Sequence, residues 1–268
     1  MRVMLKELFK ENGFFQLHDN DWLIKQRIAG KIAAKALNNL ETLVKNKTNY
    51  SLIELSNISE NLITEAGGTP TFKGYKGFPA SVCISINKQL VHGIPTDYHL
   101  QDGDIVKFDL GVTYEGAIVD TAITCIYGTP KHDWHIKIIN ATYEALDKGI
   151  AAIAVDKKLG VIGNAIYKSA KGNGFSVITK YGGHGISSDK DGNGILHANP
   201  FIENKSEINV GIRFQEGFSI AIEPLLVGGN STKTYIDKYG AVCCEDICAH
   251  FEHTVYVHKN YVEIITAR

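Results

Sequence analysis

Net charge is what this sequence most clearly lacks. Its 268 residues include 28 Lys and Arg against 29 Asp and Glu, which gives a net charge of −1. Proteins that hold nucleic acid or anionic membranes by electrostatics present a basic surface and commonly a basic excess. The composition shows no such excess, so we expect neither a nucleic-acid partner nor a membrane partner.

Long apolar runs and a cysteine framework are also missing. No stretch approaches the ~20 apolar residues of a membrane span. Residues 1–10 interrupt their apolar positions with charges, unlike a secretory signal. The five cysteines are an odd number, which suits a reducing compartment better than a disulfide framework. We therefore expect a cytoplasmic protein without disulfides.

What is present is a repeated order of elements. Residues 1–18 are expected to form a short arm with a turn at Asn12-Gly13, and Asp19 or Asn20 to cap the first helix. Apolar spacing and a Ser51/Glu54 capping box predict helices over 22–46, 51–66, 134–153 and 159–172. Alternation and β-branched content predict strands over 82–86, 106–126, 176–179, 210–214, 218–222, 249–257 and 261–266.

The order of two helices followed by strands occurs twice along the chain. It predicts an α+β fold in which helices cover a largely antiparallel central sheet. No low-complexity linker divides the chain, so we expect a single domain over 1–268 with two architecturally similar halves, roughly 15–130 and 131–268. A cleft between the two halves is where we expect a site.

Residues 107–121 form the most informative stretch, a predicted hairpin with a carboxylate on each arm. A turn centred between Tyr114 and Glu115 would place Asp109 directly opposite Asp120. Paired residues of an antiparallel ladder share a face about 5 Å apart, where two like charges destabilise the sheet. The pair therefore requires a shared proton or a metal ion.

Three further polar residues lie in strand-like apolar company: His184, Glu223 and Glu252. Each has an ordinary explanation by itself, since Glu223 could end a strand before Pro224 and His184 could occupy a glycine turn. Together with the two aspartates they make four carboxylates and one imidazole. This ligand set suits a dinuclear site for Mn, Fe, Co or Zn.

Several motifs resemble type I methionine aminopeptidases over roughly residues 15–268. They are Ser81–Asn87 (SVCISIN), Val91–Pro95 (VHGIP), Phe108–Gly111 (FDLG) with Asp120, Gly183–Ile186 (GHGI), Ile222–Pro224 (IEP) and Phe251–Thr254 (FEHT). The resemblance implies the pita-bread fold and a site with two divalent metal ions (Co, Mn, Fe or Zn). It also implies removal of the initiator methionine from nascent proteins with a small second residue, by a monomer working near the ribosome.

The resemblance also implies a role for each site residue. Asp109 would chelate one metal, His184 and Glu223 would hold the other, and Asp120 and Glu252 would bridge both. A water shared by the metals would attack the scissile carbonyl, with Glu223 as general base. His197 would donate a hydrogen bond to the developing oxyanion. His92 would hydrogen-bond the scissile amide. The pocket for the methionine side chain would be lined by Tyr75, Phe78, Cys83 and Leu196.

Two departures from the family pattern stand out. His184 and His197 are thirteen residues apart where the family usually has seven, which indicates an insertion over 187–194. The family also has a tryptophan before its last glutamate, whereas residues 239–248 contain none, so the rim of the methionine pocket is expected to differ.

Other interpretations fit the sequence less well. Residues 189–194 resemble the start of a calcium loop, but its twelfth position is Pro200 instead of glutamate, which favours a polar turn. A zinc site built from Cys243, Cys244, Cys248, His250 and His253 matches no usual spacing. His250 shares a strand face with Glu252, opposite to His253. His132, His135 and His258 are expected on the surface.

Two other functions remain as alternatives. One is a non-catalytic binding module of the same fold, which would typically lack metal ligands and carry a basic surface. The other is a proline-directed peptidase of the same fold, which usually has a large additional N-terminal domain.

Overall fold

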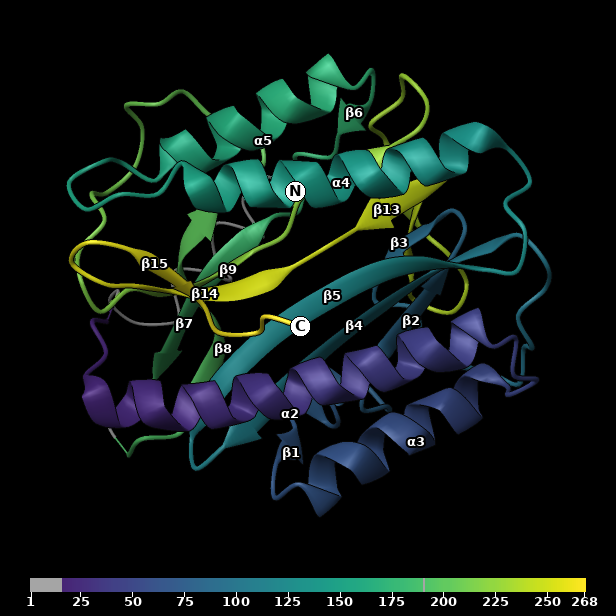
Figure 1. Cartoon of the computed structure of the whole chain (residues 1–268), viewed down its shortest axis with the longest axis horizontal. Coiled ribbons are helices and arrows are strands. Elements are labelled where there is room, and N and C mark those ends of the chain that lie inside the picture. Colours follow the sequence, from purple (N-terminus) through teal and green to yellow (C-terminus); the bar gives the residue numbers. More distant parts are fainter. Residues whose placement is uncertain (1–15, 190) are drawn as a thin grey trace.

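A computed structural model describes residues 16–189 and 191–268 (Figure 1). The turn expected at Asn12-Gly13 lies outside these residues. Two helix pairs flank a central layer of strands, with α2 and α3 on one side and α4 and α5 on the other (Figure 1). This is the predicted α+β architecture, with the helix-helix-strand order repeated in the two halves. None of the helices in the described ranges combines the length and apolar character needed to cross a bilayer.

Local sequence signals determine where the helices begin. Helix α2 spans Asn20–Lys45, and its N-cap Asp19 accepts a hydrogen bond from the Trp22 backbone N–H. Helix α3 spans Leu52–Glu65 behind the predicted capping box of Ser51 and Glu54. The second pair is α4, Asp133–Ala151, and α5, Gly160–Gly172. All four predicted helices are therefore confirmed, with boundary differences of a few residues.

The strands form two larger and two smaller sheets. The first larger sheet contains β1 (Thr69–Pro70), β2 (Cys83–Ile86), β4 (Asp104–Tyr114) and β5 (Ala117–Tyr127). The second contains β7 (Gly183–Ser188), β8 (Gly194–Ile202), β9 (Ser219–Ile222), β14 (His253–Val257) and β15 (Val262–Ile264). The smaller sheets are β3 (Gln89–Val91) with β11 (Thr234–Ile236) and β12 (Val242–Cys244), and β6 (Ser176–Val177) with β10 (Leu225–Val227) and β13 (Cys248–His250).

Strand β5 joins the two halves of the molecule. A backbone bridge links Ala122 of β5 to Glu252, between β13 and β14. On either side of that bridge, threonine hydroxyls replace the ladder bonds: Thr254 Oγ1 donates to Asp120 O, and Thr124 Oγ1 donates to His250 O. These cross-links fix the sheets of the two halves edge to edge, and two of the predicted site residues lie on the junction.

Three expectations about the elements were wrong. Residues 210–214 form no regular strand and contribute only a single bridge, Lys158 to Arg213. The strand expected over 249–257 is interrupted at Phe251-Glu252, because the chain passes there from the sheet of β13 to the sheet of β14. His135 is buried on α4 instead of exposed.

We predict that Gly183→Ala destabilises the protein by about 3 kcal/mol, because a Cβ atom would lie 2.1 Å from the Ala221 carbonyl oxygen on the neighbouring strand. Gly172→Ala at the end of α5 is the matched control, since nothing lies within 4 Å of its Cβ position. It is expected to stabilise by about 0.5–1 kcal/mol. Urea unfolding of both variants measures the difference, and equal effects would contradict the packing argument.

Candidate metal centre

The hairpin register differs from the predicted one. Asp109 pairs with Ala122, and Asp120 pairs with Gly111, so the two aspartates are diagonal neighbours instead of direct partners. The turn is centred on Glu115-Gly116, which have φ angles of 45° and 86°, instead of between Tyr114 and Glu115. A shift by one turn position moves every partner by two residues and so keeps the face. Asp109 and Asp120 consequently still point the same way, as expected.

A single line of paired residues brings the first-half ligand candidates to Glu252. Asp109 on β4 pairs with Cys83 on one side and with Ala122 on the other, and Ala122 bridges to Glu252. Residues paired in this manner share a face. The small Ala122 side chain thus lies between two carboxylates, and Asp120, two residues earlier on β5, projects from the same face.

The second half supplies the other two candidates in a similar manner. His184 on β7 pairs with Ala221 on β9, and Glu223 follows two residues after Ala221. His184 therefore belongs to a strand and not to a turn. Glu223 does end its strand before Pro224, as the simpler interpretation held, yet its carboxylate also enters the cavity.

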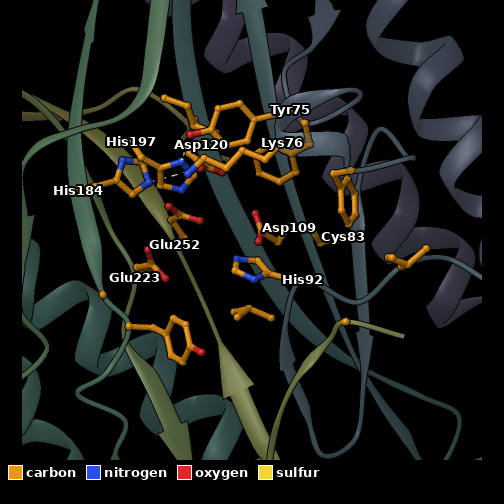
Figure 2. Close-up of a pocket in the computed structure, with 18 of the residues that line it drawn as sticks. Tyr75, Lys76, Cys83, His92, Asp109, Asp120, His184, His197, Glu223 and Glu252 are labelled. Carbon is orange, nitrogen blue, oxygen red and sulfur yellow. Dashed lines mark hydrogen bonds and ion pairs between the residues drawn. The ribbon is translucent and has the colours of Figure 1, made fainter. Parts of the chain in front are cut away.

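The five residues converge on one region of the cavity (Figure 2). Three groups among the described residues have potential ligand atoms within 4.8 Å of one another. These groups are Asp109, Asp120 and Glu252; His184, Glu223 and Glu252; and Asp120, His184 and His197. The His184 Nε2 and Asp120 Oδ2 atoms are 3.6 Å apart. Asp120, His184 and Glu252 each belong to two groups, so the three groups form one continuous cluster of potential ligands.

Burial and mutual repulsion both disfavour the ionised form of these carboxyl groups. Burial, followed by the charges of Asp120 and Glu223, raises the pKa of Asp109 well above its ordinary value. Burial likewise raises the pKa of Glu252 well above its ordinary value and that of Glu223 to about 7. Burial alone would lower the pKa of His184, but its bond to Asp120 and the surrounding charges raise it.

Divalent cations fit this donor set. Asp109 Oδ1, Asp120 Oδ1 and Glu252 Oε1 are buried and have no hydrogen-bond partner in the described structure. Within the same residues, no Lys or Arg nitrogen lies within 4.0 Å of the four carboxylates. The buried Lys107 ammonium instead donates to the carbonyls of Asn87 and Cys248. Hard oxygen ligands with one imidazole suit a divalent first-row metal.

Two more predicted histidines border the same cavity. His197 Nδ1 lies 3.0 Å from the Tyr75 hydroxyl, and its ring centroid is 4.4 Å from that of His184. The insertion over 187–194 lies at the tip of the β7–β8 hairpin, and His197 lies further along β8, beside His184. His92 has a left-handed φ of 61°, an uncommon conformation that directs its ring towards Asp109 (Figure 2). Burial lowers the pKa of His92 and, more strongly, that of His197.

A cavity of about 500 Å³ adjoins the carboxylates and is lined by all four predicted pocket residues, Tyr75, Phe78, Cys83 and Leu196. Several lining residues were missed by sequence reasoning: Phe72, Lys76, Lys180, Tyr181 and Phe201. The ring centroids of Phe72 and Phe78 are 6.5 Å apart in an edge-to-face arrangement. The aromatic residues around Gly74 and Gly77 were the sequence signal that could have indicated this wall of the pocket. Gly240 lines the wall in the segment without tryptophan.

The competing ion sites find no support in the geometry. Asp189 accepts hydrogen bonds from the backbone N–H groups of Asp191 and Asn193, so its carboxylate closes a polar turn. No cysteine belongs to any candidate metal group among residues 16–189 and 191–268. His250 and His253 do diverge, since His250 approaches Glu223 and Glu252 whereas His253 Nδ1 contacts Thr266.

Comparison with known proteins agrees with this geometry. The family model described as "Metallopeptidase family M24" matches residues 25–259. The chain belongs to metallopeptidase family M24. Metal-dependent peptide hydrolysis is the chemistry of this family, and the resemblance stated from the motifs is confirmed.

Individual M24 relatives refine the comparison. A methionine aminopeptidase of Mycoplasma capricolum is 38% identical over 93% of this chain and 97% of its own length. The crystal structure of methionine aminopeptidase from Rickettsia prowazekii has a TM-score of 0.87 and 35% identity, covering 95% of this chain and all of its own. A prolidase from Pyrococcus horikoshii has a TM-score of 0.69, covering 94% of this chain and 63% of its own. Because its identity is only 20%, this similarity shows the fold alone. The pita-bread fold is thereby confirmed.

Proposed function

We propose that this M24 metallopeptidase removes N-terminal methionine from peptides whose second residue is small, using two divalent metal ions. The metal-dependent aminopeptidase activity follows from the family and from relatives at 33–39% identity that are named methionine aminopeptidases. The observation that carries the finer proposal is the convergence of four buried carboxylates and His184 beside an apolar cavity. One domain over the whole chain with two similar halves remains part of the proposal.

The ligand assignment follows from the shared positions. Asp109 would hold one metal, and His184 with Glu223 would hold the other. Asp120 and Glu252 would bridge, because each is shared by two candidate groups and has two carboxylate oxygens to offer, whereas His184, which is also shared, would offer one ring nitrogen to one metal. Bound metal ions supply a water of lowered pKa and polarise the scissile carbonyl. The identity among Co, Mn, Fe and Zn is not fixed by this donor set, which suits all four.

The surrounding side chains complete the reaction. Glu223 would also be the general base, because its carboxylate enters the cavity beside the other ligand candidates and can accept a proton from the attacking water. His197 remains neutral and is oriented by Tyr75, so it can donate to the carbonyl oxygen as negative charge develops. His92, on the opposite side of the cavity from His197, is positioned to contact the scissile amide and assist the leaving nitrogen (Figure 2).

The apolar part of the cavity accounts for methionine. Cys83 lies on the same face as Asp109, so a side chain packed against its sulfur is held next to the ligand cluster. Phe78, Tyr75 and Leu196 add aromatic and aliphatic surface, which suits a thioether. We further propose that the substrates are nascent chains near the ribosome and that the enzyme acts as a cytoplasmic monomer.

Hydrolysis of three tripeptides tests the function. The protein, stripped of metal and reloaded with Mn²⁺ or Co²⁺, is expected to release methionine from Met-Ala-Ser. Met-Arg-Ser should be cleaved poorly because arginine is large, and Ala-Pro-Ala should not be cleaved. Absence of metal-dependent release from Met-Ala-Ser would refute the proposal, and preferential cleavage of Ala-Pro-Ala would favour the proline-directed alternative.

We predict that His197→Ala lowers kcat on Met-Ala-Ser by about 10²–10³-fold, because a donor to the developing oxyanion is lost. KM should change much less, and metal content should stay at the wild-type level if His197 serves the substrate and not the metal. Steady-state kinetics and metal analysis measure both. His132→Ala, which removes an exposed histidine, is the control and should match wild type.

A further inference from the structure

His250 is a buried histidine whose ring has no hydrogen bond in the described structure. The residue is 1% exposed, and both ring nitrogens lack a partner. Its Nε2 atom lies 3.7 Å from Glu223 Oε2 and 3.8 Å from Glu252 Oε2. Burying an unsatisfied imidazole costs free energy, so a ring that faces two glutamates at nearly equal distances calls for a functional explanation.

The backbone around His250 is anchored from two sides. Its N–H donates to Thr124 Oγ1 at 2.9 Å, and the same hydroxyl donates to the His250 carbonyl at 2.6 Å. On the other side it pairs with Leu225, two residues after Glu223. The ring therefore starts from a fixed point adjacent to both glutamates, and His250 does not line the cavity that Glu223 and Glu252 enter.

No other basic group shares this position. Across residues 16–189 and 191–268, His250 is the single Lys, Arg or His side chain within 4.0 Å of the Glu223 or Glu252 carboxylate. No hydrogen-bond donor in that part of the chain reaches either carboxylate. Metal-binding carboxylates generally depend on outer hydrogen bonds for their orientation. Among the described residues, His250 is therefore the nearest basic side chain outside the candidate ligand groups that could supply that bond to both glutamates.

We propose that His250 is a positioning residue, whose Nε2–H donates to the Oε2 atoms of Glu223 and Glu252 and holds both carboxylates in their metal-binding orientation. The proposal rests on the function proposed above. The present separations exceed a hydrogen bond, and a movement of less than ~1 Å by either glutamate would close the gap. His250 belongs to none of the candidate ligand groups in the described structure, which separates it from the metal ligands themselves.

Three variants separate positioning from packing. His250→Leu removes the donor and retains bulk, whereas His250→Gln retains an N–H donor of similar reach. His135→Gln is the matched control, because His135 is also a buried histidine with an unpartnered ring nitrogen but does not line the cavity. Calorimetric titration with Mn²⁺, the visible spectrum of the Co²⁺ protein and Met-Ala-Ser kinetics are measured on each. His250→Asn, with a shorter amide, replaces the leucine variant if that variant does not fold.

The expected result is a loss of Mn²⁺ affinity of about 10–100-fold in His250→Leu, an altered Co²⁺ spectrum and a kcat reduced more than KM. His250→Gln should recover most of the affinity, and His135→Gln should resemble wild type in all three. Wild-type affinity and spectrum in His250→Leu would overturn the proposal, as would loss of one bound metal, which would make His250 a ligand. Metal binding is read without substrate, so failure of the wild type on Met-Ala-Ser would reject the function separately.

Discussion

Asp109→Asn is expected to abolish methionine release and, at the same time, to stabilise the protein prepared without metal. In the proposed site, the carboxylate would contribute a ligand oxygen to the Asp109, Asp120 and Glu252 group. Losing it removes several kcal/mol of metal-derived transition-state stabilisation, so the rate should fall by about 10³-fold or more. Kinetics on Met-Ala-Ser with Mn²⁺ in excess measure this loss.

The stabilisation follows from the same burial. Asp109 is 8% exposed, and its pKa is raised by burial and by the charges of Asp120 and Glu223. An amide carries no charge and can donate to Asp120, so the repulsion disappears. We expect about 1–3 kcal/mol of added stability without metal, at roughly 2–4 °C per kcal/mol in the melting temperature. Added Mn²⁺ should stabilise wild type much more than the variant.

Asp104→Asn is a demanding control, because Asp104 is an equally buried aspartate on the same strand. It accepts hydrogen bonds from Asn87 Nδ2, the Tyr98 hydroxyl and the Gln101 N–H. Burial would raise its pKa, but these bonds lower it. Asp104→Asn should therefore destabilise by about 1–3 kcal/mol and leave methionine release intact. The same sign of stability change in both variants would contradict the assignment of Asp109 to a metal centre.

The helices and the cluster of buried carboxylates could be predicted from sequence for a physical reason. Helical periodicity and the Ser51/Glu54 capping box are local signals, and α2 and α3 begin where those signals are. The carboxylates could be recognised because charge in apolar strands is costly without compensation. Neither the helix prediction nor the recognition of the carboxylates depended on how the two halves of the molecule pack together.

The errors came from backbone geometry that side-chain patterns encode weakly. The hairpin register was misplaced because the turn was centred one residue too early, although a glycine at 116 is typical of the two-residue primed turn. The strands around His184 were not expected, since their glycines resemble turn residues, yet Gly183 and Gly185 are needed for close strand approach.

The part of the site that sequence could least predict is the one that depends on the junction of the halves. Glu252 reaches Asp109 because the chain leaves one sheet and bridges to Ala122 at that residue, a contact over 130 positions. The sequence placed His250 on the strand face of Glu252, and the two side chains do lie 3.8 Å apart, but the approach of His250 to Glu223 arises only through the pairing of β10 with β13. Such contacts are set by tertiary packing and leave no local periodic signal.

The stability of the protein without metal is expected to fall as pH rises through 7, and metal is expected to reverse that slope. Glu223 has a pKa raised from 4.5 to about 7, so its protonated form contributes about 3 kcal/mol that is complete below 4.5 and lost as pH approaches 7. Burial raises the pKa values of Asp109 and Glu252 well above their ordinary values too, so the loss of their protons at higher pH acts in the same direction.

Buried histidines oppose this trend only at lower pH. Burial depresses the pKa of His92, His197 and His250, so their contributions are lost as pH falls below 6.5, and above 7 these rings are neutral in both states. Measurements from 7 to 7.5 therefore report mainly the carboxyls, and they end about one pH unit below the ordinary thiol pKa of about 8.5. Bound Mn²⁺ needs ionised ligands, so stability with metal should rise with pH.

Urea unfolding with EDTA or with Mn²⁺ measures both slopes. Asp109→Asn should flatten the decline in EDTA, because one of the carboxyls that retains its proton in the folded state is gone, and an unchanged slope would show that the decline originates outside this cluster.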